Sequence, residues 1–346
     1  MKICILSVQI PFITGGAESL ALALKRELRC RRVDADILLL PFKWYPPEQL
    51  LKCMLMSRLA DVTEVNGVKI DRLITLKFPA YYVPHPRKVC WLLHQHRQAY
   101  DLYGTPLSDL SQGETGRAVA AEISRWDKAF LPDHSAIFTI SKRVTERLRR
   151  YNEIESTPLY PPLDHERFKA GRFDRYIFYP GRFDPLKRQH LVFEAFATLP
   201  ADLQLVFCGQ FDSPYASDLI ARIEASPLRS RVRVLGQVPE AEKEALYANC
   251  LAVYNGVLDE DYGYVTLEAF CASKPVITHT DSGGPLEFVV DGYNGYITEP
   301  DPLELADRIR LLVEQPAEAR RLGRNGHDTL KSHDISWDHV IDRLLD

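Results

Sequence analysis

The sequence lacks the cysteine spacing of a zinc centre or of a disulfide framework. Its seven cysteines form no Cys-x-x-Cys pair, and most of them lie in apolar runs. Such a set is typical of buried thiols in a reducing compartment, not of a secreted, cross-linked domain. We therefore expect a cytoplasmic protein whose cysteines belong to the core.

Other absences exclude further classes of protein. No apolar run approaches the roughly 18 residues of a membrane span, and the start, Met-Lys-Ile-Cys-Ile-Leu, lacks a signal-peptide layout. There is no Gly-x-Gly-x-x-Gly fingerprint, which argues against a nicotinamide dehydrogenase. A net charge of -4 without a nucleic-acid motif argues against nucleic-acid binding. We expect a soluble protein that can still touch a membrane surface.

Charge is distributed unevenly along the chain. Residues 1–170 carry 25 Lys and Arg against 19 Asp and Glu, so this half is basic and the remainder is acidic. A basic cluster (Lys25, Arg26, Arg29, Arg31, Arg32) closes a predicted helix. It can complement the negative end of that helix, or it can face an anionic surface. Both interpretations stay open.

The first half of the chain reads as an α/β domain. A strand at 3–8, a loop ending in Gly15-Gly16 and a helix at 17–28 open a doubly wound fold. Another strand, at 88–93, runs into His94, where parallel sheets place their ligands. His94 is thus a functional candidate, with a structural histidine as the alternative. His94 and His96 have no third ligand at metal-binding spacing, so we expect no metal there.

The second half restarts the alternation of strands and helices after the stiff segment Tyr160-Pro161-Pro162. We expect domains at 1–165 and 172–330, with a last helix at about 331–346 that can pack back on the first. Strands are predicted at 176–179, 203–208, 232–235, 251–254, 275–278 and 296–298. Helices are predicted at 189–198, 215–225, 241–248, 265–273, 285–290 and 303–314. The fold class is α/β, with two Rossmann-like doubly wound domains facing a central cleft.

The functional prediction rests mainly on the stretch Asp259–Glu268 (DEDYGYVTLE). It follows an apolar run and places Gly263 at the start of a predicted helix. Glycine lets the backbone approach a ligand closely, and the first helix amides are free donors at the positive end of a dipole. An anionic ligand suits this position. Glu260 and Glu268 could then contact hydroxyl groups on either side of it.

Five motifs in one order carry a resemblance. They are GGAE at 15–18, GRFDPLK at 181–187, LGQVPEAEKEALYANC at 235–250, EDYGYVTLE at 260–268 and SGGPLE at 282–287. The order resembles that of the retaining glycosyltransferases of family 4, which have the GT-B fold and carry a Glu-x7-Glu pair. The second half matches strongly, and the first half matches more loosely.

The resemblance implies roles for these residues. Arg182 and Lys187 would hold the donor diphosphate, where negative charge develops as the nucleotide leaves. Glu260 would contact the donor sugar and Glu268 the ribose. Backbone groups of the remaining donor-site residues would line sugar, phosphate and base (Gly15, Gly16, Gly236, Val238, Tyr262, Gly263, Tyr264, Val265). His94 would lie near the transferred sugar, so the catalytic set is Glu260, His94, Arg182 and Lys187.

The resemblance also implies a reaction: transfer of a hexose, with retention and without metal or cofactor, from a UDP- or GDP-type sugar. The acceptor would be a glycan or a lipid-linked molecule, in polysaccharide or lipopolysaccharide biosynthesis at the inner face of a membrane. A sugar-nucleotide epimerase, a sugar-phosphate synthase and a non-catalytic GT-B scaffold remain alternatives. Asp259-Glu260-Asp261 also fits a metal-binding Asp-x-Asp, which the basic pair Arg182 and Lys187 makes unnecessary.

Overall fold

A computed structural model describes residues 1–12, 15–164 and 167–346. The chain divides into two compact units. The first unit comprises Met1–Pro162 together with Ile335–Asp346, and the second comprises Leu163–Asp334. The C-terminal segment therefore belongs to the unit that the N-terminus begins.

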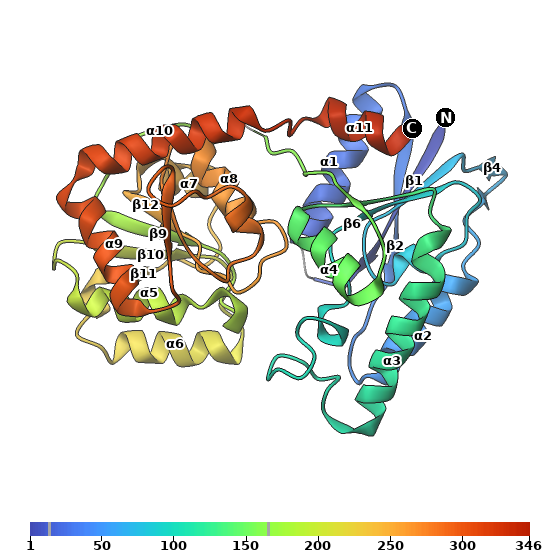
Figure 1. Cartoon of the computed structure of the whole chain (residues 1–346), viewed down its shortest axis with the longest axis horizontal. Helices are drawn as coiled ribbons and strands as arrows, with labels where there is room; N and C mark the ends of the chain where they lie inside the picture. Colours follow the sequence, from blue (N-terminus) through green and yellow to red (C-terminus); the bar gives the residue numbers. More distant parts are fainter. Residues whose placement is uncertain (13–14, 165–166) are drawn as a thin grey trace. The chain divides into compact units, whose positions relative to one another are not determined.

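The first unit is built on a parallel sheet with strand order β2-β1-β5-β6-β7-β8. Its strands are β1 (Lys2–Gln9), β2 (Asp34–Pro41), β5 (Arg72–Thr75), β6 (Lys88–Leu92), β7 (Ala136–Thr139) and β8 (Thr157–Pro158), beside a hairpin of β3 (Glu64–Val65) and β4 (Val68–Lys69). Its helices are α1 (Gly16–Cys30), α2 (Glu48–Leu59), α3 (Gly113–Phe130), α4 (Lys142–Asn152) and α11 (Trp337–Leu345). Helix α2 packs beside α3, and α11 lies against α1 (Figure 1).

The second unit repeats this architecture with strand order β11-β10-β9-β12-β13-β14. Its strands are β9 (Tyr176–Pro180), β10 (Gln204–Cys208), β11 (Val232–Val234), β12 (Ala252–Tyr254), β13 (Val276–His279) and β14 (Gly295–Thr298). Its helices are α5 (Gln189–Ala195), α6 (Pro214–Glu224), α7 (Glu240–Asn249), α8 (Tyr264–Cys271), α9 (Pro302–Glu314) and α10 (Pro316–Ser332). In Figure 1, α7, α8 and α10 cover one face of this sheet, and α5 and α6 cover the other.

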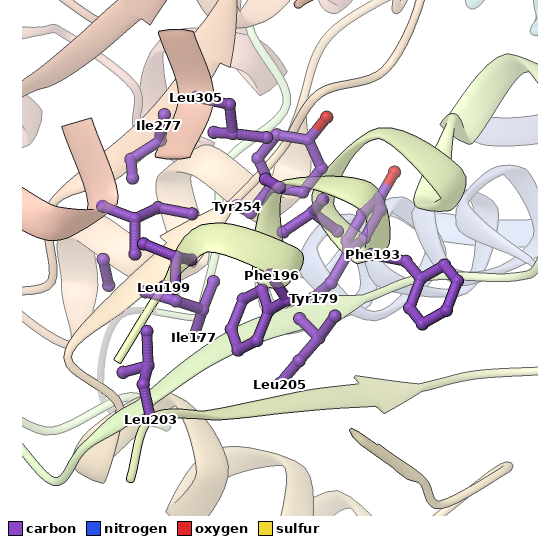
Figure 2. Packing of buried hydrophobic residues seen from close by; sticks show 14 of the residues in the cluster. Ile177, Tyr179, Phe193, Phe196, Leu199, Leu203, Leu205, Tyr254, Ile277 and Leu305 are labelled. Carbon is purple, nitrogen blue, oxygen red and sulfur yellow. The ribbon is translucent and has the colours of Figure 1, made fainter. Parts of the chain in front are cut away.

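The core of the second unit lies between its sheet and helices α5 and α9. Figure 2 shows Phe193 and Phe196 packed over strand residues such as Tyr179 and Leu205. Two of the core aromatics also reach the carboxyl edge of the sheet, one at a loop and one at the last residue of β13. Tyr179 donates its hydroxyl hydrogen to the carbonyl oxygen of Lys187, and the Tyr254 hydroxyl lies 2.7 Å from Nε2 of His279. The core therefore fixes the loops that follow β9 and β13.

Parallel pairing gathers the polar loops of this unit at one edge. Because neighbouring strands run in the same direction, the loops after β9, β10, β11, β12 and β13 all leave from the carboxyl ends. Gly209 illustrates how close they come: its amide donates to the carbonyl of Gly236 at 2.8 Å, and the amide of Gly181 donates to that of Cys208 at 2.7 Å. The motifs at 181–187, 235–238, 260–268 and 282–287 therefore share one side of the sheet.

The helix predicted at 285–290 is wrong. The structure has only a 3-10 turn, η7 (Gly284–Glu287), at this place. The amide of Phe288 bonds to the carbonyl of Pro285, three residues back, and the amide of Val290 bonds to the side chain of Asn294 at 2.8 Å. The buried Asn294 side chain therefore takes over the backbone bonding that a longer helix would need.

Candidate functional site

Helix α8 begins at the carboxyl edge of the second sheet with its first amides unused. Gly263 caps it in the left-handed region, at φ 94°, and a Cβ there would lie 2.9 Å from Cγ of Pro285. Glycine is required for both reasons. Within the described residues, the amides of Tyr264 and Val265 donate no hydrogen bond. The helix therefore presents open donors and the positive end of its dipole, which suits an anion.

The loop before α8 is fixed by pairing with the loop after β13. The amide of Asp259 donates to the carbonyl of Asp281, and that of Glu260 to Ser282, both at 2.9 Å. In return the amide of Gly284 donates to the carbonyl of Glu260 at 2.8 Å. This pairing works like a short continuation of the sheet and holds the Glu260 backbone in place.

Glu260 forms an ion pair with Lys187, 73 residues earlier in the chain. Lys187 ends the 3-10 turn η4 (Pro185–Lys187), and each side chain keeps 24% of its surface exposed. The amine therefore balances the carboxylate while both remain accessible to a ligand. Of the residues that the sequence singles out, these two are brought into direct contact.

Arg182 lies in the same loop, but its side chain is more open. The side chain is 60% exposed, and a carboxylate oxygen of Asp184 lies 3.5 Å from its guanidinium. The backbone is better fixed than the side chain, because the buried Gln189 donates to the Arg182 carbonyl at 2.9 Å. Arg182 is thus a loosely paired cation on a fixed loop.

Glu268 lies one turn into α8 and already has two partners from α7. Lys243 Nζ lies 3.1 Å from one carboxylate oxygen, and the hydroxyl of Tyr247 donates to the other at 2.5 Å. Burial and then the Glu268 charge raise the pKa of Tyr247 well above its ordinary value, so this hydroxyl stays a donor. Only 14% of the Glu268 side chain is exposed, which leaves the carboxylate oriented and within reach.

Gly236 and Val238 follow β11 at the same edge. Gly236 has φ 69°, and a Cβ there would lie 2.9 Å from the ring of Phe211. Phe211 is 42% exposed, and its ring centre lies 6.4 Å from that of Phe183. An open aromatic ring beside an open backbone turn is suited to a flat, uncharged group such as a base. The sequence singled out the glycine and missed the ring, which comes from the loop after β10.

The sequence also missed a side chain that ties this edge together. Arg188 forms a two-pronged ion pair with Asp281, at 2.7 and 2.8 Å, and donates to the carbonyls of Gly256 at 2.8 Å and Val257 at 3.1 Å. Burial raises the pKa of Asp281, but the bonds and charge of Arg188 outweigh it and leave that pKa below its usual value. The bare sequence places Arg188 beside Lys187, as one more loop cation.

Three predicted site residues belong to the first unit. Gly15 precedes α1, and its amide donates to the Glu18 carboxylate at 2.8 Å; Gly16 is the first residue of that helix. His94 follows β6 at the carboxyl edge of the first sheet. Its Nδ1 lies 2.6 Å from the carbonyl oxygen of Gln95. Their roles toward a donor stay predictions.

Asp259-Glu260-Asp261, the alternative metal-binding pattern of the sequence, lies in the loop before α8. In the stretches 1–12, 15–164 and 167–346, no group of His, Cys, Asp and Glu side chains has the arrangement of a metal site. Asp259 takes a left-handed backbone at φ 46° while its amide pairs with the loop after β13. The cations that face Glu260 and Glu268 are lysines.

Comparison with known proteins finds sequence similarity in the second unit. Residues 164–329 match the family model described as glycosyl transferases group 1. The matched residues lie within the second unit and make up just under half of the chain. Alpha-1,3/1,6-mannosyltransferase ALG2 from Dictyostelium discoideum is 31% identical over 131 residues, which are 36% of this chain and 31% of that protein. The chain thus spans about a third of that relative's length.

Solved structures extend the likeness to both units. Sucrose-phosphate synthase from Thermosynechococcus elongatus matches with a TM-score of 0.83 at 18% identity, over 99% of this chain and 96% of that one. Anabaena HepE in complex with UDP-glucose matches with a TM-score of 0.73 at 17% identity, over 100% and 98%. These likenesses confirm the predicted α/β GT-B fold.

Proposed function

We propose that this protein is a retaining glycosyltransferase that moves a hexose from a nucleoside-diphosphate sugar to a glycan or lipid-linked acceptor, without a metal. The observation that carries the proposal is the group of charged and backbone donors at the start of α8. Lys187, Glu260 and the amides of Tyr264 and Val265 meet there, and Glu268 lies one turn farther on. A diphosphate needs cations and amides, and sugar hydroxyls need carboxylates.

Each residue then has a part in binding or in the reaction. Lys187 and Arg182 neutralise the diphosphate, and the α8 amides bind its oxygens. Glu268, oriented by Lys243 and Tyr247, accepts hydrogen bonds from the ribose hydroxyls. Glu260 accepts from the donor sugar once Lys187 turns to the phosphate. His94 and the Gly15-Gly16 turn contact the transferred sugar from the first unit.

The proposed reaction keeps the anomeric configuration. The acceptor hydroxyl attacks the anomeric carbon on the face from which the diphosphate leaves. The carbon–phosphate-oxygen bond breaks as the glycosidic bond forms, and the acceptor proton passes to the leaving diphosphate. Negative charge develops on the diphosphate as it leaves. Arg182 and Lys187 stabilise that charge, which lowers the barrier. No carboxylate needs to form a covalent intermediate with the sugar, unlike in retaining glycosidases.

A thermal-shift series with UDP, GDP and ADP, each with and without EDTA, tests the donor site. A ligand that binds only the folded state stabilises it by about 2.7 kcal/mol at roughly a hundred times its dissociation constant. We expect one nucleotide to raise the melting temperature, in the presence of EDTA as well. Glu268→Ala and Arg182→Ala should abolish the shift. The matched surface variants Glu194→Ala and Arg229→Ala, which also break ion pairs in this unit, should keep it.

Product analysis tests the reaction. Proton NMR should show the donor's anomeric configuration in a product joined to an acceptor; an inverted product would refute retention. A free epimerised sugar nucleotide would indicate the epimerase, and a product on a sugar phosphate would indicate the synthase. No nucleotide-induced shift at millimolar concentration would favour the scaffold, and a shift abolished by EDTA would revive the metal interpretation.

We further propose that the protein works in polysaccharide or lipopolysaccharide biosynthesis, in the cytoplasm at the inner face of a membrane. The basic first half of the sequence supports this proposal, because a lipid-linked acceptor lies at an anionic surface. Among the helices of the described chain, none is long and apolar enough to cross a membrane. Contact would therefore be made by a surface of the protein.

A further inference from the structure

Helix α2 is apolar on its outer side as well as on its inner side. Leu50 and Met54 are fully buried on the inner side. The outer side carries apolar residues whose exposed fractions are substantial (Leu51 37%, Leu55 51%, Met56 38%, Leu59 74%). Leu51, Leu55 and Leu59 are spaced by four residues and so form one line along the helix. Surface helices normally turn a polar face outward, so this line indicates a binding surface.

The segment before α2 adds aromatic and basic groups. Phe42 packs against the core, the Trp44 ring lies 6.5 Å from the Phe42 ring, and the Tyr45 ring lies edge-on to Trp44 at 5.0 Å. Tyr45 is 56% exposed, and Lys43 Nζ lies 5.1 Å from the centre of its ring. The ring contacts of Phe42 and Trp44 thus hold the exposed Tyr45, and with it Lys43, just before the helix that carries the apolar line.

Charged side chains of both signs lie near this line. Lys43, Lys52 and Glu48 are all exposed, and so is Asp61, two residues beyond the end of the helix. The Arg58 side chain is engaged with the body of the unit, because its guanidinium lies 4.4 Å from the centre of the Phe130 ring and donates to the Tyr82 carbonyl at 3.4 Å. The apolar line is therefore bordered by two exposed lysines and two exposed carboxylates.

The basic cluster of α1 is less available than its sequence suggests. Lys25 forms an ion pair with Asp36 at 2.6 Å, and Arg29 lies 3.8 Å from the same carboxylate. Arg31 pairs with Glu27 at 3.0 Å and also with Asp338 of α11. Acidic neighbours therefore neutralise much of this charge, and the large exposed apolar side chain beside it is Leu22 alone among the residues of α1 that the structure describes.

We propose that the α2 face, defined as Tyr45, Leu51, Leu55, Met56 and Leu59, binds the surface of a lipid bilayer that contains anionic lipid. The aliphatic side chains would enter the boundary between headgroups and acyl chains, Tyr45 would lie at headgroup level, and Lys43 and Lys52 would meet lipid phosphates. A second copy on the same face would bring the lysines of both copies together. The inference rests on the membrane-side acceptor of the proposed function and names the surface that reaches it.

Vesicle flotation of the full chain tests the inference, with phosphatidylcholine alone and with added phosphatidylglycerol. We expect binding to the anionic vesicles that weakens as salt is raised. The double variant Leu55→Gln/Leu59→Gln should bind about tenfold more weakly, since each leucine loses apolar burial. Lys43→Gln/Lys52→Gln should lose about tenfold or more on anionic vesicles. Leu303→Gln, which changes a leucine of α9 that is 66% exposed, is the matched control and should bind like the wild type.

Three results would overturn the inference. The first is binding by Leu55→Gln/Leu59→Gln equal to that of the wild type, and the second is no binding of the wild type to either vesicle. The third is a dimer, seen by light scattering, that this double variant dissociates, because the face would then join two copies. Melting temperatures equal to the wild type's would show that the variants fold.

The nucleotide shift of the same samples reports separately on the donor site. We expect it to be unchanged by the α2 substitutions, because the candidate donor loops lie in the second unit. Vesicle binding without any nucleotide shift would refute the proposed transferase and leave the α2 face intact. A nucleotide shift without vesicle binding would refute the inference about the α2 face and leave the proposed transferase intact.

Discussion

The guanidinium of Arg188 holds the carboxylate of Asp281 with two hydrogen bonds, of 2.7 and 2.8 Å, across 93 residues of sequence. The same side chain donates to two carbonyls of the loop after β12. It therefore joins the loops that follow β9, β12 and β13, which carry Lys187, Glu260 and the Ser282–Gly284 turn. Only 11% of the Arg188 side chain is exposed, so the connection is largely shielded from water.

Replacing Arg188 with Ala should loosen these three loops together. We expect a loss of about 2 kcal/mol in the free energy of unfolding, because several charge-assisted hydrogen bonds disappear. The loss stays moderate because the Asp281 carboxylate keeps access to water. Nucleotide binding should weaken in parallel, which urea titrations and thermal shifts would measure.

Arg175→Ala is the matched control, since the exposed pair of Arg175 and Asp202 lies at the amino end of β9, away from the loops. Exposed pairs are worth less than about 1 kcal/mol. If Arg188→Ala behaved like Arg175→Ala in both measurements, the connecting role of Arg188 would be refuted.

Gly263→Ala should damage the start of α8 in two ways. A Cβ would force a left-handed backbone on alanine and would also meet Pro285 at 2.9 Å. The backbone effect alone costs about 1 kcal/mol. Gly292→Ala has φ 69° with open space around the new Cβ, so it isolates that effect. We expect Gly263→Ala to lose more stability and to bind nucleotide more weakly, whereas Gly292→Ala should bind normally. If Gly263→Ala and Gly292→Ala bound nucleotide with equal affinity, the start of α8 would tolerate the displacement that the new Cβ causes.

Tyr247→Phe removes the hydroxyl that orients Glu268. Tyr176→Phe removes a comparable hydroxyl, which donates to the Leu246 carbonyl of the same helix at 2.7 Å, away from Glu268. Each change should cost about 1 kcal/mol of stability. Isothermal titration with the nucleotide identified by thermal shift should show weaker binding for Tyr247→Phe alone. A matching loss in Tyr176→Phe would indicate a general loosening of α7 instead.

Asp127 in the first unit should make stability depend on pH. It is fully buried and accepts hydrogen bonds from Tyr81 at 2.8 Å and from Tyr82 and Tyr100 at 2.5 Å. Burial raises its pKa to about 6, although the three tyrosine bonds oppose that rise. A raised pKa means that the folded state prefers the neutral carboxyl. The stability that it contributes is complete below the unfolded pKa near 3.8 and is lost as pH rises to about 6.

Urea unfolding of the wild type and of Asp127→Asn at several pH values measures this effect. The stability of the wild type relative to the variant should fall by roughly 3 kcal/mol between about pH 4 and pH 7, with little change above that. A difference that stays constant over this range would mean that Asp127 keeps an ordinary pKa in the folded protein.

Much of the candidate site was predictable because its determinants are local. Glycine before a helix, a carboxylate one turn into that helix and a basic pair in a proline-containing loop can each be read within a short window of sequence. Lys243 and Tyr247 were within reach too, because their spacing of four residues puts them on one side of α7. They went unnoticed because nothing in their own segment indicates Glu268 as the partner.

The sequence by itself determined the alternation of strands and helices, and hence the α/β class, since side-chain periodicity and turn residues act over short distances. It also determined the residue types at the start of α8. Only the tertiary structure decided that Lys187 pairs with Glu260 and that Arg188 joins three loops. Those pairings depend on strand order and parallel register, which bring residues 73 or 93 positions apart to one edge of the sheet. A local sequence pattern carries no information about contacts between residues so far apart in the chain. The order of the strands in the packed parallel sheet determines which loops become neighbours.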